Sequence, residues 1–339
     1  MIKIDGSMGE GGGQILRTTI SLATVLGTDV NIFNIRGNRP NPGLRPQHLH
    51  AIKTLSTISH ATVNGLEINS TEVTYKPGTL KSQSLDIDMK TAGSITLLLQ
   101  AVIQSVYRQN KEFSFNIIGG TDVPWSPTLN YFRYVALPLY KKFGIDVDMQ
   151  LLKRGYYPKG GGKISFKISS NKNNRNFNIN NFSNNDTVVR ITSSKINNDL
   201  VHIQQNVIED NLRLHDIPYN IENVVENTLS DGMSILISKT SSDSYIGSDI
   251  VCNKKNIHNV GLNVVRKYIY ELKSGCSVDT NLSDMIVPLI VLSNSKFSFT
   301  SSSISEHFKT NLQVISKFLK FEYNIERKKP NFFDITIKP

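Results

Sequence analysis

Residues 12–27, GGQILRTTISLATVLG, decide the fold because they begin a pattern that the chain repeats. The stretch places apolar side chains at helical spacing, at Leu16, Ile20, Ala23 and Leu26. Residues 29–35, DVNIFNI, have the composition of a β-strand, and residues 44–58, LRPQHLHAIKTLSTI, are again typical of a helix. The sequence therefore predicts a helix, a strand, a loop and a second helix, in this order.

The same order returns twice further along the chain. Residues 92–144 contain AGSITLLLQAVIQSVY, EFSFNII, the loop GGTDVPWSP and TLNYFRYVALPLYKKFG. Residues 282–320 contain LSDMIVPLIVLSN, KFSFT, the loop SSSIS and EHFKTNLQVISKFLK. Alternating segments (EVTYK, KISFKI and FFDITIK) follow the second helix of each unit. We therefore expect an α+β fold of three repeated units, each with two helices on a small sheet, packed around shared helices.

A segment of different character separates the second and third units. It opens with the Asn-rich residues 169–186, which predict a linker or an exposed hairpin. A strand (TVVRITS), a helix (DLVHIQQNVIEDNLRL), two strands (MSILISKT and YIGSDIV) and a helix (NVGLNVVRKYIYELK) follow. The sequence predicts an α/β domain of residues 186–275, inserted into a large domain of residues 1–185 and 276–339.

Composition limits the classes of function. Apolar residues make up 39% of the chain, enough for sizeable cores, and the formal net charge of +10 favours an anionic partner such as nucleic acid or nucleotide. A solvated basic surface is the alternative. Cys252 and Cys276 lack metal-ligand spacing and indicate a reducing compartment. Without a signal peptide or an apolar run of about 18 residues, the sequence predicts a cytoplasmic protein that does not enter a membrane.

The segment before the first helix, residues 6–19 (GSMGEGGGQILRTT), combines glycines with one acid, Glu10, and one base, Arg17. Glycine lets the backbone approach a ligand closely, so the segment favours a phosphate or a sugar held against main-chain N–H groups. An ordinary tight turn is the alternative. The spacing fits neither G-x-x-x-x-G-K-[ST] nor a convincing G-x-G-x-x-G.

The first loop between strand and helix, IRGNRPNPGLRPQHL, contains several polar side chains: Arg36, Arg39, Arg45, Gln47 and His48. The planar guanidinium of arginine matches phosphate oxygens, so the loop favours a phosphodiester end over a merely solvated basic loop.

The second loop and the helix before it offer weaker candidates. Asp122 could bind a metal or cap the next helix, and Pro127 could form an apolar wall for a base. Gln100 lies on an apolar helix, where a polar side chain is most often a satisfied core group.

The third loop leads to His307 at the start of a helix. The positive end of the helix dipole disfavours imidazolium there, so a neutral ring nitrogen is available for nucleophilic attack. A structural or exposed histidine is the alternative, but the repeat places His307 where Arg39 and His48 lie in the first unit. Upstream, Asp279 and Asp284 are candidates for a metal contact, a sugar contact or helix capping.

Six segments in this order, GEGGGQILR, IRGNRPNPGLRPQHL, TAGSITLLLQ, GGTDVPWSP, RGYYPKGGG and EHFKTN, resemble the RNA 3'-terminal phosphate cyclases over nearly the whole chain. The resemblance implies three units of two helices on a four-stranded sheet and a thioredoxin-like insertion. It implies ATP-dependent conversion of an RNA 3'-phosphate into a 2',3'-cyclic phosphodiester. The route would pass through a covalent histidyl-AMP and an RNA-(3')pp(5')A intermediate.

The resemblance also implies roles for single residues. His307 would be the nucleophile, and Glu10 would help to hold a divalent metal, Mg²⁺ or Mn²⁺, since hard oxygen ligands suit both. The RNA terminal phosphate and the ATP phosphates would be bound by Arg17, Arg36, Arg39, Gln47 and His48. The adenosine pocket would be lined by Gln100, Pro127 and Asp284.

One position departs from the family. Three residues before Asp284, where relatives place an aromatic residue that stacks on adenine, this chain has Asn281. Two other classes share related folds: cyclase-like ribosome-biogenesis factors, which bind RNA without catalysis and lack the nucleophilic histidine, and enolpyruvyl transferases. His307 and the matching motifs favour the cyclases, and the oligomeric state stays open.

Overall fold

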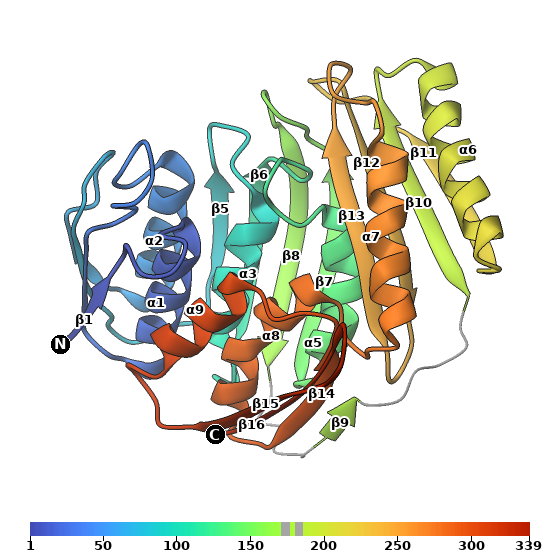
Figure 1. The fold of residues 1–339 in the computed structure, drawn as a ribbon. Helices are drawn as coiled ribbons and strands as arrows, with labels where there is room; N and C mark the ends of the chain where they lie inside the picture. Colours follow the sequence, from blue (N-terminus) through green and yellow to red (C-terminus); the bar gives the residue numbers. More distant parts are fainter. Residues whose placement is uncertain (171–176, 180–185) are drawn as a thin grey trace.

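The computed structural model describes residues 1–170, 177–179 and 186–339, and its elements form three similar units and an insertion (Figure 1). The first unit comprises β1 (Ile2–Asp5), α1 (Gly13–Leu26), β2 (Val30–Phe33), α2 (Pro46–Ser59), β3 (Thr62–Asn64) and β4 (Val73–Lys76). The second comprises β5 (Ser84–Asp88), α3 (Ile95–Val106), β6 (Glu112–Gly119), α4 (Leu129–Tyr131), η1 (Phe132–Ala136), α5 (Leu137–Lys142), β7 (Ile145–Lys153) and β8 (Gly162–Ser170). The third comprises β9 (Phe177–Ile179), α8 (Thr280–Ser293), β14 (Phe297–Ser301), α9 (Glu306–Ile315), β15 (Glu322–Lys329) and β16 (Phe332–Lys338).

The three units share one sheet connectivity. Their strand orders are β1-β2-β4-β3, β5-β6-β8-β7 and β9-β14-β16-β15. In each sheet the first two strands pair in parallel and the remaining pairs are antiparallel. The predicted α+β fold of repeated two-helix units on small sheets is confirmed.

The first strand of every unit was not predicted from the sequence. β1, β5 and β9 are short edge strands, and the side chains of β5 alternate only between exposed and half-buried. Such strands bury little apolar surface, so they give a weak periodic signal. β9 lies within the Asn-rich residues 169–186 that were predicted as a linker or hairpin; residues 171–176 and 180–185 of that stretch lie outside the described residues.

The second helix of the second unit was predicted to be continuous, but it contains the π-helical turn η1. The N–H of Leu137 bonds to the carbonyl oxygen of Phe132, five residues back. Pro138 follows directly and has no N–H to give to Tyr134, so the wider turn accommodates the proline without breaking the helix.

The inserted segment forms a fourth sheet with the order β11-β10-β12-β13. Its elements are β10 (Thr187–Ser194), α6 (Asn198–Leu214), β11 (Tyr219–Val225), β12 (Gly232–Thr240), β13 (Tyr245–Cys252) and α7 (Val260–Ser274); β11 was not predicted. The helices α6 and α7 share a separate apolar core with this sheet, while η1 contacts β12 and β13. We propose that residues 186–275 form the inserted, thioredoxin-like domain that interrupts the third unit after β9.

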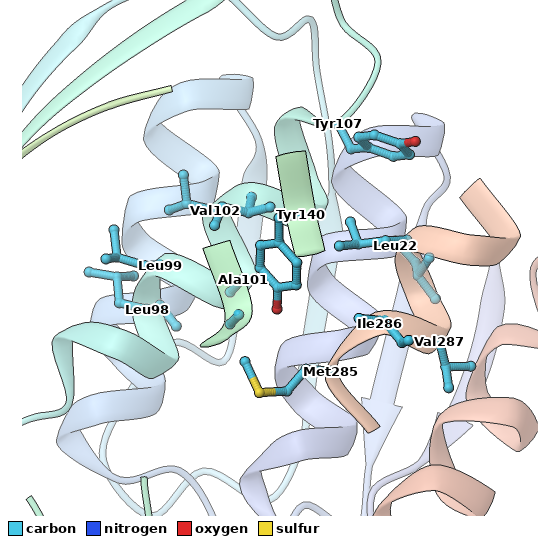
Figure 2. Close-up of a cluster of buried hydrophobic side chains, with 14 of the residues drawn as sticks. Leu22, Leu98, Leu99, Ala101, Val102, Tyr107, Tyr140, Met285, Ile286 and Val287 are labelled. Atoms are coloured by element: carbon cyan, nitrogen blue, oxygen red, sulfur yellow. The ribbon is translucent and has the colours of Figure 1, made fainter. Parts of the chain in front are cut away.

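The helices of the three units share one core. α1 packs on α2, α3 and α9, and α8 packs on α3 and α9. Figure 2 shows where they meet: Leu22 of α1, Leu99 and Val102 of α3, Tyr140 of α5 and Ile286 of α8 lie within one apolar cluster. In the part of the chain that the structure describes, no helix combines the length and apolarity needed to cross a membrane.

Candidate active site

A cavity of 460 Å³ opens where the helices of the units meet the inserted segment. Its wall is built by α1, α3, the loop between β6 and α4, β13, α7, α8 and the start of α9. Six residues singled out from the sequence line it together: Arg17, Gln100, Pro127, Asn281, Asp284 and His307. The fold thus brings residues separated by almost 300 positions to one hollow.

The N-terminus of α1 is left open by its glycines. Gly12 occupies the N-cap position, and no side chain caps this end of the helix. A Cβ atom on Gly13 would lie 2.3 Å from Nε2 of His48 and 3.2 Å from an Nη atom of Arg17, and one on Gly12 would lie 3.4 Å from an Nη atom of Arg39. The bare backbone therefore allows three donor side chains to converge on free helical N–H groups, as an anion site requires.

His48 contributes to this cluster as a neutral donor. Its Nδ1 accepts the backbone N–H of Arg45 at 3.1 Å, so Nε2 carries the ring proton toward Gly13. Burial, together with the positive charges of Arg17 and its neighbours in the loop, lowers the pKa of His48 to about 3. His48 therefore offers a hydrogen bond and no charge at neutral pH.

The charge of the cluster comes from arginines. Arg17 is half-buried in the cavity wall, and its removal from water lowers its pKa to about 10, with no neighbouring carboxylate among the described residues offsetting that burial. Burial and the charges of Arg45 and Arg39 lower the pKa of Arg36 in the same way. These guanidinium groups remain charged at neutral pH, so they favour an anionic ligand.

Glu10 connects the first and third units. One carboxylate oxygen lies 3.6 Å from an Nη atom of Arg39 and 3.6 Å from Nδ1 of His307. His307 lies in the first turn of α9 with its side chain 45% exposed, and its Nδ1 is buried without a hydrogen-bond partner among the described residues. The structure therefore brings the predicted acid, arginine and histidine side by side.

The cavity wall does not include Glu10, Arg39 and His48, and two further predicted residues also lie outside it. Arg36 is half-buried in the loop after β2, and Gln47 is exposed in the first turn of α2. Both belong to the same loop-and-helix segment as Arg39 and His48, so they extend the basic region away from the cavity.

The three predicted aspartates have three different environments. Asp284 lies on α8, accepts the hydroxyl of Ser305 at 2.5 Å, and has its pKa raised to about 7 by burial. Asp279 caps α8 by accepting the N–H of Leu282 at 2.9 Å, in agreement with the capping alternative.

The alternative that Asp122 caps the next helix was wrong. Its carboxylate forms a buried ion pair with Arg154 at 2.6 Å, and the next helix is capped by Thr128 instead. The ion pair holds Oδ2 of Asp122, while its buried Oδ1 has no hydrogen-bond partner among the described residues.

The cavity residues that were not singled out from the sequence include Trp125, Asp249 and Lys267. Asp249 on β13 accepts the backbone N–H of Thr128 at 2.7 Å, which attaches the inserted segment to the second loop. Nothing in the sequence of the inserted segment indicates that it reaches this cavity. Trp125 could have been found from the sequence, since it is the only tryptophan of the chain and lies between Pro124 and Pro127.

Comparison with known proteins agrees with this architecture. Residues 8–325 match the family model described as RNA 3'-terminal phosphate cyclase. A protein of that name from Pyrococcus furiosus is 38% identical over 323 residues, which cover 94% of this chain and 93% of that protein. Another of that name from Saccharolobus islandicus is 37% identical over 341 residues, covering 99% of this chain and 100% of that protein. The chain therefore belongs to the RNA 3'-terminal phosphate cyclase family.

Proposed function

We propose that this protein uses ATP to convert an RNA 3'-terminal phosphate into a 2',3'-cyclic phosphodiester. The observation that carries the proposal is the position of His307, which lines the cavity beside Glu10 while the arginine cluster lies at the neighbouring helix start. A nucleophile next to an anion site suits transfer of a nucleotidyl group.

The first step is attack by His307 on the α-phosphate of ATP. Because Nδ1 is buried beside Glu10, the carboxylate favours the tautomer with the proton on Nδ1 and leaves the lone pair on Nε2. A bond forms between Nε2 and the α-phosphorus, and the bond to the leaving pyrophosphate breaks. The product is a histidyl-AMP intermediate.

Two further transfers complete the reaction. An oxygen of the RNA 3'-phosphate attacks the α-phosphorus, which releases His307 and gives RNA-(3')pp(5')A. The vicinal 2'-OH then attacks the RNA phosphate, closes the ring and expels AMP. Arg17, Arg39 and His48 are positioned to donate to the terminal phosphate, because they converge on the uncapped start of α1.

The adenosine part of ATP would occupy the remaining wall of the cavity. Pro127 offers an apolar surface there, and Asp284 offers a carboxyl group. The side-chain nitrogen of Gln100 is buried without a partner among the described residues, so a ligand acceptor would satisfy it.

A divalent cation fits this site in one arrangement. Among the described residues, no group of three or more His, Cys, Asp and Glu side chains could bind a metal unaided. Mg²⁺ is commonly held by one or two carboxylates together with substrate phosphates, and Glu10 beside His307 provides such a carboxylate. When bound, the cation would supply neutralisation of phosphate charge near the nucleophile.

Incubation with α-labelled ATP and magnesium tests the proposal. We expect the protein to acquire AMP in an acid-labile, alkali-stable bond, and the His307→Ala variant to lose both labelling and cyclisation while remaining folded, because the half-exposed side chain fills no core volume. His202→Ala, which changes an exposed histidine on α6, is the control. Labelling of His307→Ala would overturn the assignment. RNA binding by the wild type without labelling would favour a non-catalytic RNA-binding factor instead.

A further inference from the structure

Trp125 is the single tryptophan of the chain and is 98% exposed, yet it contributes to the wall of the cavity. It is the only Phe, Tyr or Trp among the described residues that line this cavity. An indole presents a large, rigid apolar face, and such faces in binding sites commonly meet planar ligands. Exposure alone would not distinguish Trp125 from other surface residues, so its backbone matters as well.

The backbone of Trp125 has a φ of 61°, in the left-handed region that bulky side chains rarely adopt. The surrounding loop enforces this conformation from both sides. Ser126 donates its hydroxyl to the carbonyl oxygen of Val123 at 2.9 Å, and Thr96 donates to the carbonyl oxygen of Pro127 at 2.8 Å. A strained residue held by its neighbours points to a functional position.

The opposite ends of the loop are fixed to two different parts of the molecule. Asp122 pairs with Arg154 of the second unit, and Thr128 bonds to Asp249 of the inserted segment. Trp125 therefore lies at the tip of a loop whose ends cannot move independently, so the position of the indole at the cavity is preset.

The α8 wall of the cavity carries no aromatic side chain. Its residues there are Asn281, Asp284 and Met285, and Met285 is largely buried in the core (Figure 2). A planar base in this cavity would therefore find its aromatic partner only on the loop between β6 and α4.

We propose that the indole of Trp125 stacks on the nucleobase of ATP. This inference rests on the proposed function, because His307 lines the same cavity and fixes where the α-phosphate must lie. The surroundings of the loop agree with a base at this end: Pro124, Pro127 and Val251 are apolar, whereas the cationic Arg17 suits the phosphates. Stacking tolerates every base, so Trp125 supplies affinity and leaves discrimination between purines to polar groups such as Gln100.

The single tryptophan makes the test direct, because all indole fluorescence of the protein comes from Trp125. ATP is titrated into the His307→Asn variant, in which no covalent AMP can form. We expect saturable quenching by ATP and by adenosine, and no quenching by inorganic tripolyphosphate. A stacked base typically contributes about 1–3 kcal/mol, so Trp125→Ala should raise the Kd for ATP about fivefold to more than 100-fold in calorimetry. Trp125→Phe should retain most of the affinity.

Tyr157 provides the matched control. It is 57% exposed and lines a small hollow that shares Pro124 and Val251 with the cavity. Tyr157 itself does not line the cavity, so Tyr157→Ala should leave the Kd for ATP unchanged. Quenching by an RNA 3'-phosphate oligonucleotide but not by ATP would overturn the inference, as would equal ATP affinities of wild type and Trp125→Ala. Quenching by ATP in a wild type that never becomes labelled would instead overturn the catalytic proposal and leave the stacking intact.

Discussion

Gly12 and Gly13 are neighbours, but a methyl group would meet very different surroundings at the two positions. On Gly13 it would lie 2.3 Å from Nε2 of His48, whose buried ring cannot move cheaply, whereas on Gly12 it would lie 3.4 Å from the flexible end of Arg39. The close approach at Gly13 is what brings His48 and Arg17 to the start of α1.

We therefore expect Gly13→Ala to reduce cyclisation about 10- to 100-fold, because small displacements of positioning groups cost that much. The melting temperature should also fall, because overlap with the buried ring of His48 costs more than alanine gains in the first turn of a helix. Gly12→Ala is the control and should have a much smaller effect on the rate. Steady-state cyclisation rates and thermal unfolding of the two variants test this prediction. Equal losses of activity in Gly12→Ala and Gly13→Ala would show that the contact at Gly13 is unimportant.

The buried carboxyl of Asp284 should make the stability of the protein depend on pH. Burial raises its pKa to about 7, so between about pH 4 and pH 7 the folded protein keeps a proton that the unfolded chain has lost. This contribution to stability is complete below pH 4 and is lost as the pH rises to about 7.

Asp284→Asn removes that dependence while its side-chain oxygen can still accept the hydroxyl of Ser305. Relative to wild type, we expect the free energy of unfolding of the variant to rise by about 1–3 kcal/mol between pH 5 and pH 8. Urea unfolding at both pH values measures it. Asp148→Asn, at an exposed position on β7, serves as the control. Parallel behaviour of wild type and Asp284→Asn would contradict the prediction.

At the scale of elements, the loop between β2 and α2 is the part most specific to an anionic ligand. Arg36 and Arg39 lie in it, and His48 lies in the first turn of α2. The charges of Arg39 and Arg45 lower the pKa of Arg36, so the loop concentrates positive charge. Such a concentration is costly unless an anion is bound, so the loop should act mainly on the RNA phosphate.

Alanine at Arg36, Arg39 or His48 is therefore expected to lower cyclisation of a 3'-phosphate end about 10- to 100-fold and self-adenylylation much less, since each removes a charge-assisted or buried hydrogen bond. RNA binding should also weaken with salt. Arg213→Ala, whose guanidinium is paired with Glu209 on α6, is the control. Equal loss of both steps would place these side chains on the triphosphate of ATP.

The elements also show which features the sequence could predict. The helices α1, α3, α8 and α9 were predicted because their apolar periodicity is strong, and the N-terminal position of His307 followed from it. The edge strand β5 and the pairing of Asp122 with Arg154 could not be predicted in this way. An edge strand has little apolar pattern, and an ion pair between residues 32 positions apart depends on tertiary packing.

At the scale of the whole molecule, the inserted segment is part of the cavity and not an appendage to it. Asp249 from β13 and Lys267 from α7 line the cavity. Burial raises the pKa of both Asp249 and Asp284, and the positive charge of Lys267 opposes that rise at both carboxyl groups. Lys267 thus interacts electrostatically with a carboxyl group of the inserted segment, Asp249, and with one of α8, Asp284. Sequence alone did not show this, because Asp249 lies 122 positions after Pro127, the last residue of the second loop, and Lys267 lies further still.

We therefore expect Lys267 of the inserted segment to strengthen the binding of ATP. In the His307→Asn background, Lys267→Ala should raise the Kd for ATP about three- to fivefold at low salt, as expected for a solvent-accessible charge near an anion. Higher salt should reduce this difference, because mobile ions screen exposed charges. Lys273→Ala is the matched control, since that residue lies on the same helix with its amine 3.0 Å from His215 and away from the cavity. Calorimetric titration of ATP into the two variants measures the effect. Equal affinities would mean that the insertion only packs beside the nucleotide. A loss of affinity confined to Lys267→Ala would show that α7 contributes to nucleotide binding.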